Sequence, residues 1–340
     1  MNPFTLMFGK EPLLTIRRDQ IISKIFTDFS SSLPASQIYI LVGARGAGKT
    51  VVLTELYNTF EAEDWVVADV NPHRNILEDL AAQIYEKGKV RKLFLKGELD
   101  ISFHGISFHL EGKEPASSIS AVVEKMLAHL KKKNKKLLIT VDEATSNDNI
   151  KEFAHDFQSL VRKELPVYLV MTGLYENVMS LQNDKSLTFL YRAPKILLSP
   201  LDLKAVEKSY AKELSVDDNQ AKNLAQMTKG YGFGYQLLGY LFYSKKIIDD
   251  DLLDEFDYQL RINAYDKIWS STSENERRIL RVLCDADEVA VSEIMERTGF
   301  NNKFFSSYRE RLLQKGVVIS KRRGFLSLAL PRFDIFILQQ

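Results

Sequence analysis

The stretch IYILVGARGAGKT, residues 38–50, decides the fold of this 340-residue chain. Its first five residues are apolar, which is typical of a short buried parallel strand. The next eight, Gly43–Thr50, match G-x-x-x-x-G-K-[ST], the pattern of a loop whose main-chain N–H groups wrap a phosphate. In that pattern the lysine, Lys49, reaches the outer phosphates and Thr50 ligates Mg²⁺. The predicted nucleotide-binding residues are Gly43, Ala44, Arg45, Gly46, Ala47, Gly48, Lys49, Thr50 and Val51.

A second apolar run, Leu137–Val141, ends in the acidic pair Asp142-Glu143. The carboxyl ends of parallel strands face the ligand crevice of an open sheet, so this pair is predicted to lie at that crevice. Asp142 is expected to hold the water shell of Mg²⁺, which makes it a metal-site residue together with Thr50. Glu143 is expected to be the general base that polarises the attacking water. The expected ligands are therefore ATP and Mg²⁺.

Strands and helices alternate between residues 38 and 200, which predicts an α/β fold with a doubly wound parallel sheet. One segment breaks this alternation: Leu99–Leu110 alternates apolar and polar residues around Gly105, the pattern of a β-hairpin. We interpret it as an insertion at about residues 99–112, with edge packing as its default role. The predicted strands are 38–42, 65–70, 137–141, 167–172 and 195–198, and the predicted helices are 19–29, 50–60, 72–85, 117–130 and 150–162.

After Pro200 the chain is predicted to be helical, with Ser215–Asp218 approximating a capping box. A second capping box, Ser273–Glu276, opens a unit of three helices followed by two short strands around Arg322-Arg323-Gly324. This order is that of a winged helix-turn-helix. In its third helix, residues 302–314, the apolar residues are predicted to face inward, Phe304 included. The predicted domains are an ATP-binding core at 1–200, a helical lid at 201–270 and the winged helix at 271–340.

The composition excludes several classes of protein. Formal net charge is +1, so any affinity for nucleic acid must come from local patches. Cys284 is the single cysteine, which rules out an internal disulfide and a multi-cysteine metal site. The five histidines lack ligand spacing. No apolar run approaches the roughly 20 residues that span a bilayer, and no signal peptide is evident, so we expect no membrane partner and a cytoplasmic location.

Together these motifs resemble the AAA+ superfamily, near its prokaryotic STAND and origin-initiator branches. The resemblance implies that Thr172, at the end of the fourth strand, contacts the γ-phosphate or its water, with a purely structural threonine as the alternative. It implies that Arg192 acts on the ATP of a neighbouring subunit of a homo-oligomer, with a surface ion pair as the alternative. Arg18 would lie beside the adenine or serve packing. The lid phrase Tyr231–Gln236 lacks the arginine that the family places there, which favours slow hydrolysis.

Two functions fit this architecture. In the first, an ATPase switches conformation and associates with double-stranded DNA through the winged helix. In the second, a STAND-like signalling ATPase uses the winged helix and the hairpin to bind protein. Fold alone does not choose between them. The residues predicted to contact DNA are Arg309, Arg311, Lys315, Lys321, Arg322 and Arg323.

Overall fold

A computed structural model describes residues 2–6, 12–87, 101–104, 107–110 and 118–340 of the chain. Over these ranges the chain forms two compact units. The first, called the sheet unit here, contains residues 19–41 and 52–196. The second contains residues 1–18, 42–51 and 197–340, and is called the loop unit because it includes the glycine-rich loop Gly43–Thr50. The division into three domains that the sequence suggests stays a prediction.

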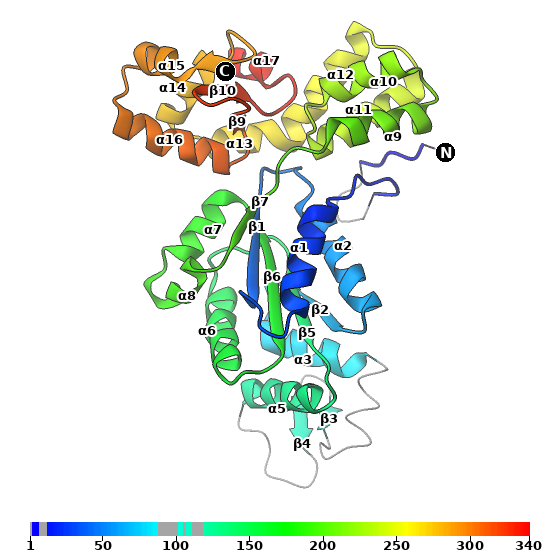
Figure 1. Ribbon diagram of the computed structural model, residues 1–340, viewed down its shortest axis with the longest axis vertical. Coiled ribbons are helices and arrows are strands. Elements are labelled where there is room, and N and C mark those ends of the chain that lie inside the picture. Colours follow the sequence, from blue (N-terminus) through cyan, green and yellow to red (C-terminus); the bar gives the residue numbers. More distant parts are fainter. Residues whose placement is uncertain (1, 7–11, 88–100, 105–106, 111–117) are drawn as a thin grey trace. The chain divides into compact units, whose positions relative to one another are not determined.

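The central sheet has five strands among the described residues, in the order β2-β5-β6-β1-β7 (Figure 1). Strand β5 pairs in parallel with β2 on one side and with β6 on the other. The predicted parallel α/β sheet is therefore confirmed. The strands are β1 Ile38–Val42, β2 Val66–Val70, β5 Leu137–Val141, β6 Val167–Gly173 and β7 Lys195–Leu197.

Helices lie on both sides of this sheet (Figure 1). Aromatic residues pack together on one side, where the centre of the Phe29 ring lies 4.8 Å from that of Tyr168 and 6.0 Å from that of Phe60. Helix α3 begins at Ile76, four residues later than predicted, because the Asn75 side chain accepts from the N–H of Glu78 and caps it. The helices are α1 Asp19–Ser30, α2 Lys49–Ala62, α3 Ile76–Glu86, α5 Ile119–Lys132, α6 Asp148–Arg162, α7 Tyr175–Gln182 and α8 Thr188–Tyr191, with a 3₁₀ turn at Lys185–Leu187.

The predicted hairpin is present where the structure describes it. Strands β3 (Ile101–His104) and β4 (Ser107–Leu110) pair antiparallel, with Ser102 opposite His109. The remainder of the predicted insertion, including Gly105, lies outside the described residues.

The helical part of the loop unit follows β7. Its N-cap residues include Asp217, whose side chain accepts from the N–H of Gln220. The prediction that Ser215 begins this helix is wrong, because Ser215 has a positive φ of 55° and ends the preceding helix. Near the N-terminus, Phe4 is buried against these helices. The helices are α9 Leu203–Leu214, α10 Asp218–Met227, α11 Gly232–Lys245, α12 Asp250–Leu260 and α13 Asp266–Ser270, with a π-helical turn at Arg261–Tyr265.

The C-terminal module, residues 274–338, has the element order of a winged helix: α14 Glu274–Val282, β8 Val289–Ala290, α15 Val291–Thr298, α16 Asn302–Gln314, β9 Val318–Ile319, β10 Phe325–Leu328 and α17 Phe333–Leu338. Its strands form an antiparallel sheet in the order β8-β10-β9. The prediction that Phe304 faces inward is wrong, because this side chain is 56% exposed. No helix in the described ranges is both long and apolar enough to cross a bilayer.

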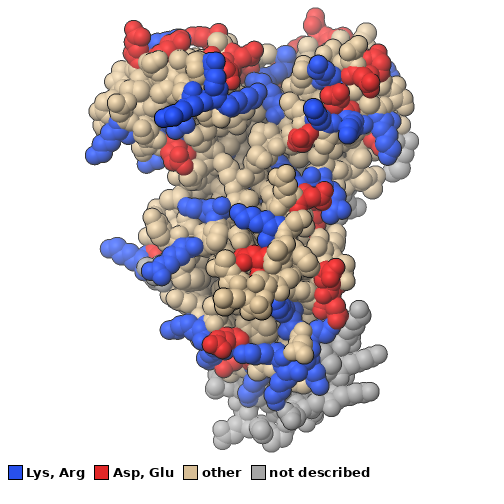
Figure 2. Space-filling model, in the orientation of Figure 1, with Lys and Arg blue, Asp and Glu red and all other residues tan. Residues whose placement is uncertain are grey.

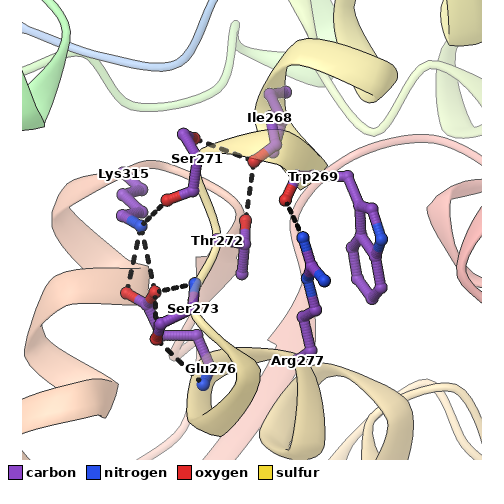
Figure 3. Close-up of polar contacts among 8 residues, drawn as sticks. All are labelled: Ile268, Trp269, Ser271, Thr272, Ser273, Glu276, Arg277 and Lys315. Atoms are coloured by element: carbon purple, nitrogen blue, oxygen red, sulfur yellow. Dashed lines mark hydrogen bonds and ion pairs between the residues drawn. The ribbon is translucent and has the colours of Figure 1, made fainter.

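A buried ion pair ties the helices of this module together (Figure 3). Lys315, directly after α16, lies 3.1 Å from each carboxylate oxygen of Glu276 on α14 and donates to the main-chain oxygen of Ser271 at 2.9 Å. Glu276 also accepts from the N–H and the hydroxyl of Ser273, completing the predicted capping box. The prediction that Lys315 contacts DNA is therefore wrong, because its side chain is buried and paired.

We expect Lys315→Met to destabilise the protein by about 3–5 kcal/mol, because it leaves the Glu276 carboxylate buried without its counter-charge. The double variant Lys315→Met, Glu276→Gln should recover much of that loss, since glutamine keeps the cap without the charge. Lys245→Met is the control: its partner Asp249 is 3.5 Å away and both side chains are more than one-third exposed, so the cost should stay below about 1 kcal/mol. Urea denaturation measures all three, and equal losses for the two lysine variants would contradict the assignment.

Candidate functional site

The loop between β1 and α2 has a backbone that only glycine adopts without strain at two positions. Gly46 has φ +75° and Gly48 has φ +88°. The N–H of Ala47 donates to the main-chain oxygen of Ala44 at 3.1 Å and closes a turn inside the loop. Lys49 is 8% exposed, and its Nζ donates to the carbonyls of Gly43 and Ala44 at 3.0 Å each. The Lys49 ammonium group thus contacts the main chain of a glycine-rich loop at the start of a helix.

Arg18 reaches this loop from the N-terminal side of the chain. Its Nη2 donates to the main-chain oxygen of Ser199 at 2.8 Å, and its Nη1 lies 3.2 Å from where a Cβ on Gly48 would be. The structure therefore brings Arg18 and the predicted nucleotide-binding residues together within the loop unit. A second positive charge beside the loop suits an anionic ligand.

A cavity of about 220 Å³ lies next to the loop, wholly within the loop unit. Most of its lining side chains are apolar, and Arg18 and Ser320 add polar groups. Its volume suits a planar heterocyclic base better than a drug-sized ligand, whose pockets measure roughly 300–1,000 Å³. The walls come from the loop (Ala44, Ala47), the segment after β7 (Leu197, Leu198, Ser199, Pro200), the segment Gly230–Gly232 and the C-terminal module (Leu313, Gly316, Val318, Ile319, Ala329, Leu330).

The acidic pair and Thr172 form a second group, within the sheet unit. Thr172, fully buried at the end of β6, donates its hydroxyl hydrogen to Oδ1 of Asp142. The N–H of Glu143 donates to the same Oδ1 at 3.0 Å and to the Thr172 hydroxyl at 3.1 Å. Glu143 is exposed and has a positive φ of 52°. Thr172 therefore fixes the Asp142 carboxylate, while the Glu143 side chain projects to the surface.

Asp69 is an acidic residue near this group that the sequence analysis missed. It lies on β2 opposite Thr140 of β5, whose hydroxyl donates to its carboxylate at 2.7 Å. Partial burial raises the pKa of Asp69, the negative charge of Asp142 raises it further, and the Thr140 hydrogen bond opposes both effects. A carboxylate within the otherwise apolar run Val66–Val70 was the available signal.

Arg192 is exposed and follows α8 directly, next to Tyr191, which is 67% exposed. Its action on a neighbouring subunit stays a prediction. Groups of three or more histidine, cysteine or acidic side chains arranged to hold a metal ion do not occur among the described residues.

Basic side chains gather on the face of the C-terminal module where β9 and β10 lie (Figure 2). Lys321, Arg322 and Arg323 occupy the exposed turn between these strands. The Arg322 guanidinium lies 3.6 Å from the centre of the Phe325 ring of β10 and 3.8 Å from Glu288, just before β8, so side chains on both sides of the turn contact it. Arg311 is exposed on α16, whereas Arg309 is half-buried.

The sheet order, the glycine-rich loop between β1 and α2, the following helices and the C-terminal module define an AAA+-type α/β fold. Among solved structures, Cdc6p from Pyrobaculum aerophilum is similar with a TM-score of 0.50 and 14% identity, over 98% of this chain and 96% of that chain. ORC2 from Aeropyrum pernix, in its ADPNP–ADP complexes, is similar with a TM-score of 0.53 and 13% identity, over 96% and 93%. The resemblance in fold to origin-initiator AAA+ proteins is therefore confirmed.

Sequence comparisons reach less far. A family model described as Domain of unknown function (DUF8462) matches residues 263–337, which include all but the last residue of the C-terminal module. A search of curated protein sequences finds no match.

We expect Gly46→Ala to destabilise the protein by about 1–3 kcal/mol more than Gly299→Ala. Both glycines have positive φ, so both variants carry the same backbone strain. A Cβ on Gly46 would overlap the Tyr231 hydroxyl and lie 2.8 Å from Cβ of Phe233, whereas nothing lies within 4 Å of a Cβ on Gly299. Chemical denaturation measures the difference, and equal losses would show that the loop is not packed as described.

Proposed function

We propose that this protein binds and slowly hydrolyses ATP, and that ATP occupancy controls its association with DNA. The observation that carries the proposal is the loop at Gly43–Thr50, where two glycines with positive φ and a buried lysine form a cradle for phosphate. A loop of this shape at a helix N-terminus offers several N–H donors and the positive end of the helix dipole to an anion.

Residues 43–51 would hold the phosphates, and Arg18, which lines the adjoining cavity, would lie beside the base. The hydroxyl of Thr50 and the carboxylate of Asp142 are the hard oxygen donors that Mg²⁺ prefers, and the bond from Thr172 fits this role because it holds Asp142 in one orientation. When bound, Mg²⁺ would neutralise charge on the phosphate oxygens.

The nucleotide base would occupy the 220 Å³ cavity beside the loop. Apolar walls favour a flat aromatic base that leaves water. We propose adenine as the base. Because few polar side chains line the cavity, apolar contact rather than hydrogen bonding would account for most of its binding.

Glu143 would accept a proton from the attacking water, because its exposed carboxylate is free of the bonds that hold Asp142 through Thr172. Arg192 would complete a neighbouring subunit's site in an ATP-dependent homo-oligomer. The absence of an arginine from Tyr231–Gln236 favours slow turnover.

We expect Glu143→Gln to lower the hydrolysis rate at least a hundredfold and leave the Kd for ATP within about threefold, because it removes a proton acceptor and keeps the shape. Glu164→Gln is a matched control: Glu164 is also exposed with a positive φ of 54°, but it precedes β6 at the opposite end of the strands. Phosphate release and isothermal titration measure the two quantities. Unchanged hydrolysis would reject the role of Glu143.

The DNA part of the proposal rests on the exposed basic turn at Lys321–Arg323 and on Arg311 of α16. In a winged helix these positions face the phosphates and the major groove, and phosphate contacts make affinity fall steeply with salt. Exposed Phe304, at the start of α16, could add an apolar contact to a thymine methyl group.

We expect the double variant Arg322→Ala, Arg323→Ala to weaken binding of duplex DNA about tenfold or more and to reduce the slope of log affinity against log salt by about 2, one for each lost phosphate contact. Lys204→Ala, Lys208→Ala removes two exposed charges from α9 and should leave both quantities unchanged. Fluorescence anisotropy across a salt series measures them. Equal effects of the two double variants, or no binding at low salt, would favour a protein partner for the C-terminal module.

A further inference from the structure

The segment Gly230–Gly234 reads Gly-Tyr-Gly-Phe-Gly, an alternation of glycine and aromatic residues at the start of α11. Gly230 has φ +75°, and a Cβ there would lie 2.5 Å from the main-chain oxygen of Leu201. A Cβ on Gly234 would lie 3.2 Å from Cγ of Pro331, just after β10. The main chain of this segment is therefore packed against the linker after β7 on one side and the C-terminal module on another.

The same segment contacts the phosphate loop directly. The Tyr231 hydroxyl donates to the main-chain oxygen of Arg45 at 2.6 Å, and the N–H of Phe233 donates to the main-chain oxygen of Gly46 at 2.9 Å. Between them, a Cβ on Gly232 would lie 3.0 Å from that Gly46 oxygen. Two consecutive loop carbonyls are thus held by two donors that are two residues apart in the segment.

The planarity of the peptide bond gives these contacts a consequence for the phosphate site. In a trans peptide the C=O of one residue and the N–H of the next point in opposite directions. The bond to the Arg45 carbonyl therefore sets the direction of the Gly46 N–H, and the bond to the Gly46 carbonyl sets that of the Ala47 N–H. The Ala47 N–H donates to the Ala44 carbonyl within the loop. The Gly46 N–H is therefore the donor whose direction Tyr231 sets, and it points away from the segment Gly230–Gly234.

Tyr231 is suited to this task because it is 4% exposed and its ring lies 6.3 Å from that of Phe233 in an edge-on arrangement. Burial raises the pKa of its hydroxyl well above the ordinary value, so the hydroxyl stays protonated and can donate at any physiological pH.

We propose that Tyr231 and Phe233 are positioning residues, which orient the peptide groups of the phosphate loop and link its occupancy by a phosphate to the helical segment at Gly230–Gly234. This inference rests on the proposed nucleotide binding. It assigns the link between this segment and the phosphates to two hydrogen bonds, one from the Tyr231 hydroxyl and one from the Phe233 N–H, in place of an arginine side chain.

The test compares Tyr231→Phe with Tyr235→Phe. Each variant keeps a buried ring and loses one hydroxyl, and the Tyr235 hydroxyl bonds Ser209 of α9 at 2.7 Å instead of the loop. Isothermal titration with ADP, ATP and adenosine measures affinity. We expect Tyr231→Phe to weaken ADP and ATP about five- to tenfold and adenosine less than about twofold, because adenosine carries no phosphate. Tyr235→Phe should change none of the three by more than about twofold.

The inference is overturned if the two variants bind ADP equally, or if Tyr231→Phe weakens adenosine as much as ADP. A wild-type protein that binds neither ADP nor ATP would remove the proposed function itself, and this inference with it.

Hydrogen exchange on the wild-type protein keeps the inference testable if Tyr231→Phe does not fold. Saturating ADP should slow exchange of the Phe233 N–H, which donates to the loop, at least threefold relative to the N–H of Ala221 in α10. Equal slowing at both positions would overturn the inference.

Discussion

The conformation of the glycine-rich loop at Gly43–Thr50 depends on hydrogen bonds to the carbonyl oxygens of Arg45 and Gly46. A loop of this kind must turn its N–H groups inward, so its carbonyls must find donors outside, and here Tyr231 and Phe233 supply them. This need for close main-chain approach explains the glycines in both the loop and the segment Gly230–Gly234. Gly46 has no room for a Cβ beneath Tyr231, and a side chain on Gly232 would press on the Gly46 carbonyl. Two short glycine-rich stretches, nearly two hundred residues apart, therefore constrain each other.

The two carboxylates directly after β5 differ from each other in how firmly they are held. Asp142 is held by a buried hydroxyl and a main-chain N–H, whereas its neighbour Glu143 is exposed on a backbone of positive φ. Of these two adjacent carboxylates, that of Asp142 is held in place by these bonds and that of Glu143 is not, which fits the roles of metal ligand and general base that we propose for them. Thr172 creates the difference, since its one hydroxyl accepts from Glu143 and donates to Asp142.

Much of this architecture could be predicted from the sequence, because its signals are local. The apolar run before Gly43, the glycine spacing and the Ser273–Glu276 box each act within a few residues, and the strands and helices that they mark are present. Some errors are local, such as the start of α3 at the Asn75 cap and the positive φ of Ser215, whereas others involve tertiary contacts. The burial of Lys315 depends on Glu276, 39 residues away, and the sequence shows only another cation in a basic run. Short α7, α8 and α17 were missed because so few residues carry little periodicity.

The packing of Gly230–Gly234 against Arg45 and Gly46 has a consequence for the smallest piece of this chain that could work alone. The glycine-rich motif ends at Thr50 and the central sheet ends at Leu197, so a fragment stopping near Pro200 would contain the motif, the acidic pair and the whole central sheet. It would nevertheless lack both donors to the loop carbonyls and two walls of the adjoining cavity, the segment Gly230–Gly232 and the C-terminal module. The glycine-rich motif and the set of residues that pack around its loop are therefore different lengths of polypeptide, and only the longer one reaches into the C-terminal module.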